Sequence, residues 1–289
     1  MKPAAFRYHA PKTIDEAVAL LAKVAGEDGR VLAGGQCLVP TMAFRLAKPA
    51  HLVDINGVTA LDRIAVTSGK LAIGACVRHA AFHRPVCEGP LGKLLTDVVS
   101  HIAHYPIRNR GTFCGSLAHA DPAAELPACM LALDARLEIA AKGSRRRIAA
   151  ADFFRGLFET DLKPGEILTA IEVPVIRADY RSGFSEFARR SGDFAMSGLA
   201  AHARFDGEVL SDVRLAYCGV DTRPVRARVA ERALEGRPFG NAVLAEAKTA
   251  LARDLDPPDD LQASGQMKLH LSQVLVGRVL TAMAKAGGA

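Results

Sequence analysis

The fold of this 289-residue chain is decided by two glycine-containing stretches, Val31-Leu32-Ala33-Gly34-Gly35-Gln36-Cys37-Leu38 and Thr112-Phe113-Cys114-Gly115-Ser116. In the first, a short predicted strand leads into consecutive glycines. Successive backbone N–H groups can then point into one concavity, because no Cβ stands in the way, and such a concavity can hold a diphosphate. A plain tight turn explains Gly34-Gly35 equally well.

The second stretch adds groups that can bind a polar ligand. Thr112 and Ser116 carry hydroxyls, Gly115 permits close backbone approach, and Asp121 offers a carboxylate that can accept from sugar hydroxyls. Asp121 can also be a helix N-cap, since a proline follows it at the favoured first helical position. His119 has no partners at metal-ligand spacing, so we assign it no acid, base or metal-binding role.

The N-terminal part of the chain mixes helices and strands around these stretches. Thr13 and Glu16 form a capping box before an apolar helical repeat over residues 14–24. The other elements expected here are strands at residues 30–33 and 51–55, a hairpin around residues 67–70, and a helix over residues 91–102. Residues 103–118 lack periodicity and contain one proline and two glycines, so we expect a long irregular loop with a function.

The remaining pattern predicts a second domain. Pro174 ends a strand over residues 167–173, which follows a helix at 125–133 and a hairpin at 142–144. We therefore expect an N-terminal domain at residues 1–176, with two α+β subdomains that divide near residues 56–62, and a C-terminal domain at 177–289. For the latter the sequence predicts a three-stranded sheet, at residues 184–190, 198–205 and 213–219, followed by helices at 227–234, 242–252 and 266–285.

Composition excludes several classes of protein. Nearly half of the residues, 49%, are apolar, which excludes a disordered chain. No stretch approaches the roughly 20 apolar residues of a membrane span, and the N-terminus lacks the apolar run of a secretory signal. The six cysteines form no CxxC pair, which predicts reduced thiols and no metal site. We expect a soluble, cytoplasmic protein.

The net charge of +6 comes with local arginine clusters. Arg145, Arg146 and Arg147 are consecutive, and another cluster surrounds Arg226. Nucleic-acid binding is disfavoured, because no tryptophan and only four tyrosines accompany the basic residues. The clusters are either solvated surface or docking sites for an acidic partner.

The usual signatures of nucleotide sites and hydrolases are absent from the sequence. It contains no GxGxxG, no GxxxxGK[ST], no HExxH and no GxSxG motif. A nucleotide cofactor would have to be held in another way, and we assign no catalytic residue.

Together the motifs resemble the FAD-binding medium subunits of the xanthine dehydrogenase and carbon monoxide dehydrogenase family of molybdenum hydroxylases. Loops similar to AGGxSLxP and TxGGxxAxADP enclose FAD in that family. The resemblance also covers the opening residues 6–17, the lead-in residues 107–112, the strand start at residues 166–168 and residues 187–195. It implies an α+β fold in which a two-subdomain FAD-binding domain of the vanillyl-alcohol-oxidase type precedes the smaller C-terminal domain.

The resemblance also implies which residues contact FAD. Residues 31–38 would surround the diphosphate, while Ile102 and Ala103 would border the flavin ring. Residues 112–116 and Asp121 would hold the ribityl and phosphate portions of FAD. Leu168 would pack near the adenine or the ring edge. The complete set of candidate cofactor-binding residues is Val31, Leu32, Ala33, Gly34, Gly35, Gln36, Cys37, Leu38, Ile102, Ala103, Thr112, Cys114, Gly115, Ser116, His119, Asp121 and Leu168.

Three positions depart from the family pattern. Cys37 stands where serine is common. Cys114 replaces the first glycine of a Gly-Gly pair, so a positive φ there would cost about 1 kcal/mol. Glu186 stands where several relatives have a lysine near the flavin ring, and its carboxylate would disfavour an anionic reduced flavin.

The division of labour in the family implies a function. The chain would carry FAD and accept electrons from a small subunit with [2Fe-2S] clusters, which receives them from a large molybdopterin subunit. The three would form a dimer of heterotrimers that reduces an external acceptor. A free-standing FAD-dependent oxidoreductase with its own substrate pocket is the alternative interpretation.

Overall fold

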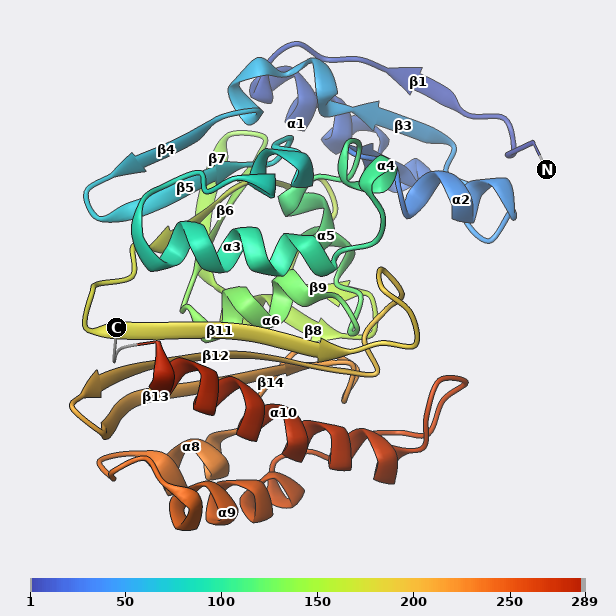
Figure 1. Ribbon diagram of the computed structural model, residues 1–289. Coiled ribbons are helices and arrows are strands. Elements are labelled where there is room, and N and C mark those ends of the chain that lie inside the picture. Colours follow the sequence, from blue (N-terminus) through green and yellow to red (C-terminus); the bar gives the residue numbers. More distant parts are fainter. Residues whose placement is uncertain (1, 287–289) are drawn as a thin grey trace.

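In the computed structural model, which describes residues 2–286, the chain runs from a small parallel sheet at the top of Figure 1 to a helical layer at its bottom. The first sheet has the order β1-β3-β2. Its strands are β1 (Arg7–His9), β2 (Gly29–Leu32) and β3 (His51–Asp54). Helix α1 (Ile14–Val24) begins where predicted, because the Thr13 hydroxyl accepts a hydrogen bond from Glu16 N at 3.1 Å.

A five-stranded antiparallel sheet follows, with the order β4-β5-β10-β6-β7. Its strands are β4 (Ile64–Thr67), β5 (Lys70–Gly74), β6 (Arg136–Ala141), β7 (Ser144–Ala149) and β10 (Ile167–Pro174). Two hairpins therefore flank a central strand that comes last in sequence. Because β10 pairs with both hairpins, it joins parts of the chain that are far apart in sequence.

Short helices connect these strands. They are α2 (Leu38–Ala43), α3 (Gly89–His101), α4 (Tyr105–Arg108), α5 (Phe113–His119), α6 (Glu125–Ala132) and α7 (Ala150–Phe153). A small hairpin of β8 (Phe154–Gly156) and β9 (Glu159–Thr160) follows α7. The chain also forms 3-10 turns at Ala25–Glu27, Ile55–Gly57, Thr59–Leu61, His79–His83 and Leu251–Arg253.

The C-terminal part is an antiparallel sheet with helices on one face. Its strands lie in the order β11 (Tyr180–Phe187), β12 (Ser197–Asp206), β13 (Val209–Cys218) and β14 (Val225–Arg226). Helices α8 (Arg228–Leu234), α9 (Asn241–Ala250) and α10 (Gly265–Lys285) form the layer below the sheet in Figure 1, whereas α3 and α6 lie above it. The three predicted strands are confirmed, and β14 adds a two-residue strand at the edge.

The hydrophobic core is continuous between these sheets. One cluster of buried side chains includes Leu95 of α3 and Met130 of α6, and it extends to Ala200 and Cys218 of the C-terminal sheet. A second cluster lies between the other face of that sheet and helices α8 to α10. Helices α3 and α6 thus position the C-terminal sheet relative to the rest of the chain.

Two expectations about local structure are wrong. Residues 103–118 are not an irregular loop, since they contain α4 and α5. Pro106 lies in the first turn of α4, where a missing N–H is tolerated. Asp121 does not cap α6, whose N-cap is Ala124; its carboxylate instead accepts from Ala123 N at 2.9 Å in the preceding turn.

Among the residues that the structure describes, no helix combines the length and apolarity needed to cross a bilayer. The cytoplasmic location stays a prediction of the sequence.

One buried ion pair anchors α8 to the C-terminal sheet, and it yields a test of the fold. Arg226 and Glu231 are 8% and 7% exposed, and Glu231 also accepts from Leu215 N at 2.8 Å. Arg226→Ala would leave a buried carboxylate without its partner, so we expect a loss of about 3–5 kcal/mol in the free energy of unfolding. Arg228 lies 3.5 Å from the same carboxylate but is 58% exposed.

Denaturant unfolding of the two variants measures this difference. Arg228→Ala is the matched control, and it should cost no more than about 1 kcal/mol. Equal losses for the two variants would contradict the structural role assigned to the buried pair.

Candidate functional site

The Gly34-Gly35 turn packs directly on the second glycine-containing stretch. A Cβ added at Gly34 would lie 2.5 Å from Arg110 O and 2.8 Å from Gly111 Cα, so only glycine fits between the two backbones. Gly35 has φ +74°, the left-handed region that glycine adopts at no steric cost. Helix α2 begins three residues later at Leu38. The two stretches are therefore parts of one structural unit.

A short hydrogen-bond chain joins the same two backbones. Asn56 Nδ2 donates to Ala33 O at 2.8 Å, and Asn56 Oδ1 accepts from Arg78 Nη2 at 2.5 Å. Arg78 Nη1 in turn donates to Arg110 O. Asn56 and Arg78 thus hold the glycine turn and the Arg110 segment together.

A recess of about 300 Å³ opens at this junction. It is lined by Leu32, Ala33, Gly34, Gly35, Gln36, Val39, Pro40, Asp54, Asn56 and Arg110. The Asp54 carboxylate within it accepts from Tyr8 Oη at 2.5 Å and from Asn56 N at 2.9 Å. Two consecutive glycines, Gly34 and Gly35, are among the lining residues, and such a turn can present main-chain N–H groups to an anion.

The stretch from Thr112 to Ser116 is the first turn of α5 rather than a loop. Thr112 is its N-cap, and the Thr112 hydroxyl accepts from Gly115 N at 3.1 Å. Cys114 lies inside the helix, so the expected cost of a positive φ does not arise.

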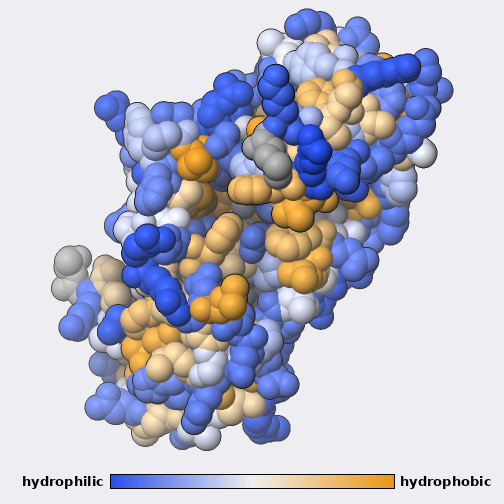
Figure 2. Space-filling view, turned by 90° about the vertical axis from the view of Figure 1, so that its right-hand side faces the viewer, coloured by the Kyte–Doolittle hydropathy of each residue, from blue (hydrophilic) through white to orange (hydrophobic). Residues whose placement is uncertain are grey.

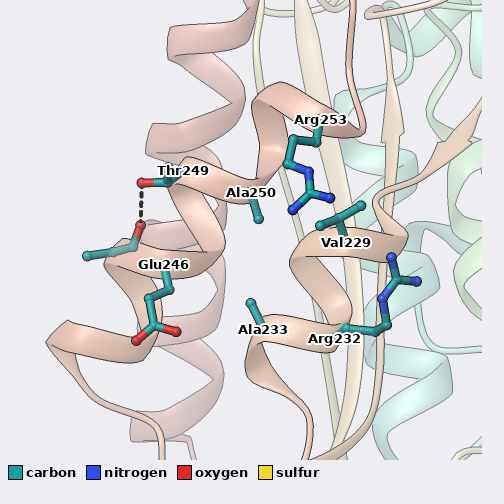
Figure 3. A pocket seen from close by; sticks show the side chains of 8 residues that line it. Val229, Arg232, Ala233, Glu246, Thr249, Ala250 and Arg253 are labelled. Atoms are coloured by element: carbon teal, nitrogen blue, oxygen red, sulfur yellow. Dashed lines mark hydrogen bonds between the residues drawn. The ribbon is translucent and has the colours of Figure 1, made fainter.

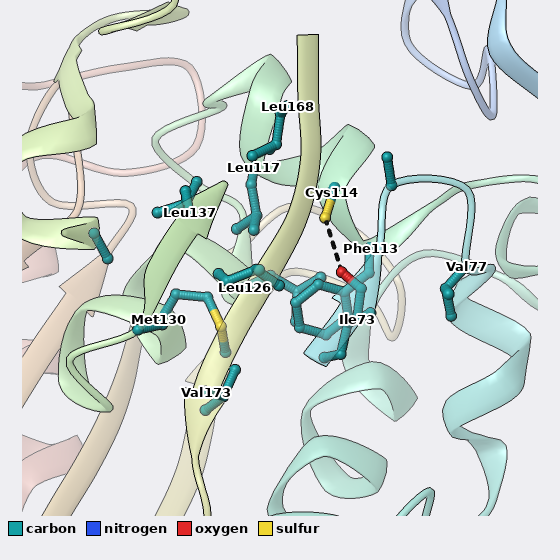
Figure 4. Packing of buried hydrophobic residues seen from close by; sticks show 14 of the residues in the cluster. Ile73, Val77, Phe113, Cys114, Leu117, Leu126, Met130, Leu137, Leu168 and Val173 are labelled. Atoms are coloured by element: carbon teal, nitrogen blue, oxygen red, sulfur yellow. Dashed lines mark hydrogen bonds between the residues drawn. The ribbon is translucent and has the colours of Figure 1, made fainter. Parts of the chain in front are cut away.

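The Cys114 side chain faces the core and not the recess. Its Sγ lies 3.7 Å from Ile73 O, and Figure 4 shows it among buried residues between α5 and the five-stranded sheet. Burial raises the pKa of the thiol far above its usual range, so Cys114 is an inert core residue.

Asp121, Cys37 and His119 gather beside this helix. Cys37 is exposed, and the pKa of its thiol is raised, first by desolvation from its neighbours and second by the Asp121 carboxylate. The His119 ring packs on Phe158 of the β8–β9 hairpin, with ring centroids 4.9 Å apart. Burial lowers the pKa of His119, and the neighbouring Asp121 opposes this shift.

The candidates Ile102, Ala103 and Leu168 do not line the recess. Ile102 and Ala103 follow α3, where Arg108 Nη1 donates to both carbonyl oxygens at 2.8 and 2.9 Å. Ala103 has φ +45°, and Gly192 packs so tightly on it that a Cβ there would lie 2.7 Å from Ala103 O. Leu168 is 4% exposed and its side chain belongs to the core. The structure packs the turn at Gly34 against residues 110–112. Of the predicted site residues, five line the recess, namely Leu32, Ala33, Gly34, Gly35 and Gln36. The others do not line it: Val31, Cys37, Leu38, Ile102, Ala103, Thr112, Cys114, Gly115, Ser116, His119, Asp121 and Leu168.

A larger hollow on the C-terminal part has different properties. A groove of about 680 Å³ lies between α8 and α9 and is lined partly by Ala233, Ala245 and Ala250, with Arg232 and Arg253 at its edge (Figure 3). No unpaired buried polar atom among the described residues points into it. Across residues 2–286, no group of three or more His, Cys, Asp or Glu side chains is placed to hold a metal ion.

Sequence reasoning missed Asp54, Asn56, Arg78 and Arg110. Asp54 and Asn56 come directly after the predicted strand at residues 51–55, so the end of that strand was the available signal. Arg78 is isolated in sequence, and only the tertiary pairing of residues 77–79 with 111–113 brings it to the site.

Comparison with known proteins covers nearly the whole chain. Residues 4–176 match the family described as FAD binding domain in molybdopterin dehydrogenase, and residues 182–283 match the CO dehydrogenase flavoprotein C-terminal domain. The alpha subunit of the 6-hydroxypseudooxynicotine dehydrogenase complex of Paenarthrobacter nicotinovorans is 36% identical over 97% of this chain and 95% of the relative.

Carbon monoxide dehydrogenase of Hydrogenophaga pseudoflava is similar in both sequence and structure. Its medium chain is 33% identical over 98% of each chain. A solved structure of that enzyme, in a form that lacks the Mo-pyranopterin moiety of the molybdenum cofactor, has a TM-score of 0.94 at 35% identity and covers 98% of each chain.

The tight contact at Gly34 gives a direct test of the site geometry. Gly34→Ala would push the glycine turn away from Arg110, and overpacking of this kind costs about 1–3 kcal/mol. Gly26→Ala is the control, since a Cβ at Gly26 would meet nothing within 4 Å. Urea unfolding should show a loss for Gly34→Ala alone. If both variants kept the stability of the parent chain, the close contact would be refuted.

Proposed function

Because this chain belongs to the family of FAD-binding medium subunits of molybdopterin dehydrogenases, we propose that it passes electrons from an iron–sulfur partner through FAD to an external acceptor. It is a flavoprotein subunit of a molybdopterin-dependent oxidoreductase, and molybdopterin and the iron–sulfur clusters belong to other subunits. Bound FAD supplies the redox chemistry, so this chain's own residues bind, orient and shield it.

The junction at Gly34 carries the proposal. Its recess is lined by Gly34 and Gly35, whose turn can offer main-chain N–H groups to the diphosphate of FAD, and a Cβ at Gly34 would break the contact with Arg110. We propose that residues 31–38 hold the diphosphate with Asn56 and Arg110. Thr112, Gly115, Ser116 and Asp121 would hold the adjoining hydroxyl-bearing part, with only the backbone of Cys114 available.

The remaining candidates would act further along the cofactor. Ile102 and Ala103 form a strained turn that Arg108 fixes from one side and Gly192 from the other, and we propose that this turn borders the flavin ring. His119 would shape the site through its packing on Phe158, and Leu168 would support it from the core.

The surface supports a subunit role. Large apolar side chains remain exposed at Phe44, Leu46, Tyr105, Phe158 and Phe194, with exposed fractions of 68%, 82%, 60%, 52% and 54%. Figure 2 shows hydrophobic surface gathered in the middle of one face, between its upper and lower parts. Exposed apolar area of this kind is typical of surfaces that another protein covers. We propose an iron–sulfur subunit and a molybdopterin subunit as partners, in a dimer of heterotrimers.

The arginine clusters are poorer docking candidates than the sequence indicated. Arg146 pairs with Asp161 and Glu166, both at 2.7 Å. The exposed Arg147 pairs with Glu138, and Arg226 is buried against Glu231. These guanidinium groups therefore already have carboxylate partners within the chain.

Purification from the native host tests the subunit role. The tagged chain should bring molybdenum, iron and FAD with it, and the complex should reduce its flavin only when a substrate of the molybdenum subunit is supplied. A chain that purifies alone and reduces its own FAD with a substrate would instead be a free-standing oxidoreductase, and would contradict the proposal.

Asn56 provides a mutational test of the diphosphate site. Asn56→Ala removes the link between Ala33 O and Arg78, and we expect FAD affinity in the assembled complex to fall about tenfold, the equivalent of one hydrogen bond of about 1.4 kcal/mol. FAD retained per complex during dialysis measures the effect. The exposed Asn109→Ala is the control. Unchanged retention in Asn56→Ala would show that the diphosphate is held elsewhere.

A further inference from the structure

One arginine ties together three segments beside the turn at Ile102 and Ala103. Arg108, the last residue of α4, is half-buried, and its Nη1 donates to Ile102 O at 2.8 Å and to Ala103 O at 2.9 Å. Its Nε donates at 3.0 Å to Nε2 of His83, the last residue of the 3-10 turn before α3. The guanidinium therefore connects α4, the end of α3 and this 3-10 turn.

The turn after α3 needs such support because Ala103 has an unfavourable backbone conformation. Its φ of +45° lies in the left-handed region, where residues other than glycine are strained. The carbonyl groups of Ile102 and Ala103 come directly after the last turn of α3, where a helix leaves carbonyl groups without internal partners. A positive charge at this end is also favoured by the helix dipole. By satisfying both carbonyl groups, Arg108 holds Ala103 in its strained conformation.

His83 fixes the orientation of the guanidinium. An arginine side chain can only donate, so His83 accepts through a lone pair on Nε2 and carries its proton on Nδ1. The His83 ring is itself held by Tyr105 of α4, since the two rings stack with centroids 5.1 Å apart and an interplanar angle of 27°. A lysine in place of Arg108 would keep the charge but has no planar fork, and could not reproduce the three donor directions.

A loop of the C-terminal sheet covers the other side of the turn. Asp193 N donates to Arg190 O at 3.1 Å and closes a tight turn between β11 and β12, in which Gly192 has φ +84°. A Cβ on Gly192 would lie 2.7 Å from Ala103 O and 2.8 Å from His104 Nδ1. The loop can therefore approach the turn this closely only because position 192 has no side chain.

We propose that Arg108 and His83 are positioning residues, which together fix the turn after α3 in the chain without FAD. The fixed turn is the seat on which the loop at Gly192 rests. The link to FAD rests on the proposed function, because the turn is assigned there to the border of the flavin ring. Neither side chain reacts. Their effect is to present one preformed backbone conformation, so that FAD binding does not have to order it.

Hydrogen exchange of the full chain without FAD tests the positioning role. Arg108→Lys keeps the charge and His83→Phe keeps the ring stack, but each removes the hydrogen bond between the two residues. In both variants we expect the amides of Ile102 and Asp193 to exchange about tenfold faster relative to those of α10, because the turn and the loop open together. The exposed Arg84→Lys is the control and should match the parent chain.

A conservative variant separates positioning from a general effect on stability. His83→Gln supplies a neutral oxygen that can accept from Arg108 Nε in place of the ring nitrogen. Its exchange should match that of the parent chain, whereas His83→Phe should exchange fast. Fast exchange in both His83 variants, or exchange like that of the parent chain in Arg108→Lys, overturns the proposal.

Two glycine variants test the seat. Gly192 and Gly236 both have positive φ, +84° and +70°, but a Cβ on Gly236 would meet nothing within 4 Å. Gly192→Ala should therefore speed exchange at Ile102, across the contact, while Gly236→Ala should leave it unchanged. An unchanged rate at Ile102 in Gly192→Ala would show that the loop does not rest on the turn.

The FAD-loaded complex tests the link to the flavin. Arg108→Lys should change the visible circular dichroism of bound FAD, which depends on the groups next to the ring. Asn56→Ala should instead lower FAD retention without changing this spectrum. An unchanged spectrum in Arg108→Lys overturns the link. If the parent complex binds no FAD, the proposed function fails, and the exchange result still decides the role of Arg108 and His83.

Discussion

The contact of Gly34 with the backbone of Arg110 and Gly111 is the constraint on which the site depends. It joins the turn after β2, in the small parallel sheet, to the segment before α5, which rests on the five-stranded sheet. Asn56 and Arg78 reinforce the same junction through hydrogen bonds to both backbones. The recess depends on Gly34, because the turn after β2 can pack against the segment before α5 only where the chain has no side chain.

A second junction, between helices α3 and α6 and the C-terminal sheet, positions the turn at Ile102 and Ala103. Helices α3 and α6 contribute buried side chains to the core that they share with β12 and β13. This packing brings Gly192 against Ala103 and Glu186 against His101. The C-terminal sheet therefore completes the surroundings of the turn after α3, and it adds the buried Glu186 side chain there.

Local signals were sufficient to predict most of the fold. The capping residue Thr13 and the apolar repeat over residues 14–24 gave the position of α1, because those signals act within a few residues. The helix predicted at residues 266–285 is confirmed as α10. Helix α5 was missed, since its seven residues are too few for a periodic pattern and include Gly115. The concern about Cys114 came from treating that helix as a loop.

The site was predictable only in part. Gly34, Thr112 and Asp121 could be named as candidates because glycine, hydroxyl and carboxylate groups stand out in sequence, and their contact with FAD stays a prediction. The contacts of Arg78 and Glu186 could not be predicted from the sequence, because each contact joins segments that are far apart in the chain and meet only in the folded structure. Even the exposure of Leu168 depends on tertiary packing, which places its side chain in the core.

A structure of the assembled complex with FAD bound tests the central claim most directly. The account predicts that the FAD diphosphate lies in the recess formed by Gly34, Gly35, Asn56 and Arg110, within hydrogen-bond distance of the glycine turn. A diphosphate bound away from this junction, such as in the groove between α8 and α9, would contradict it.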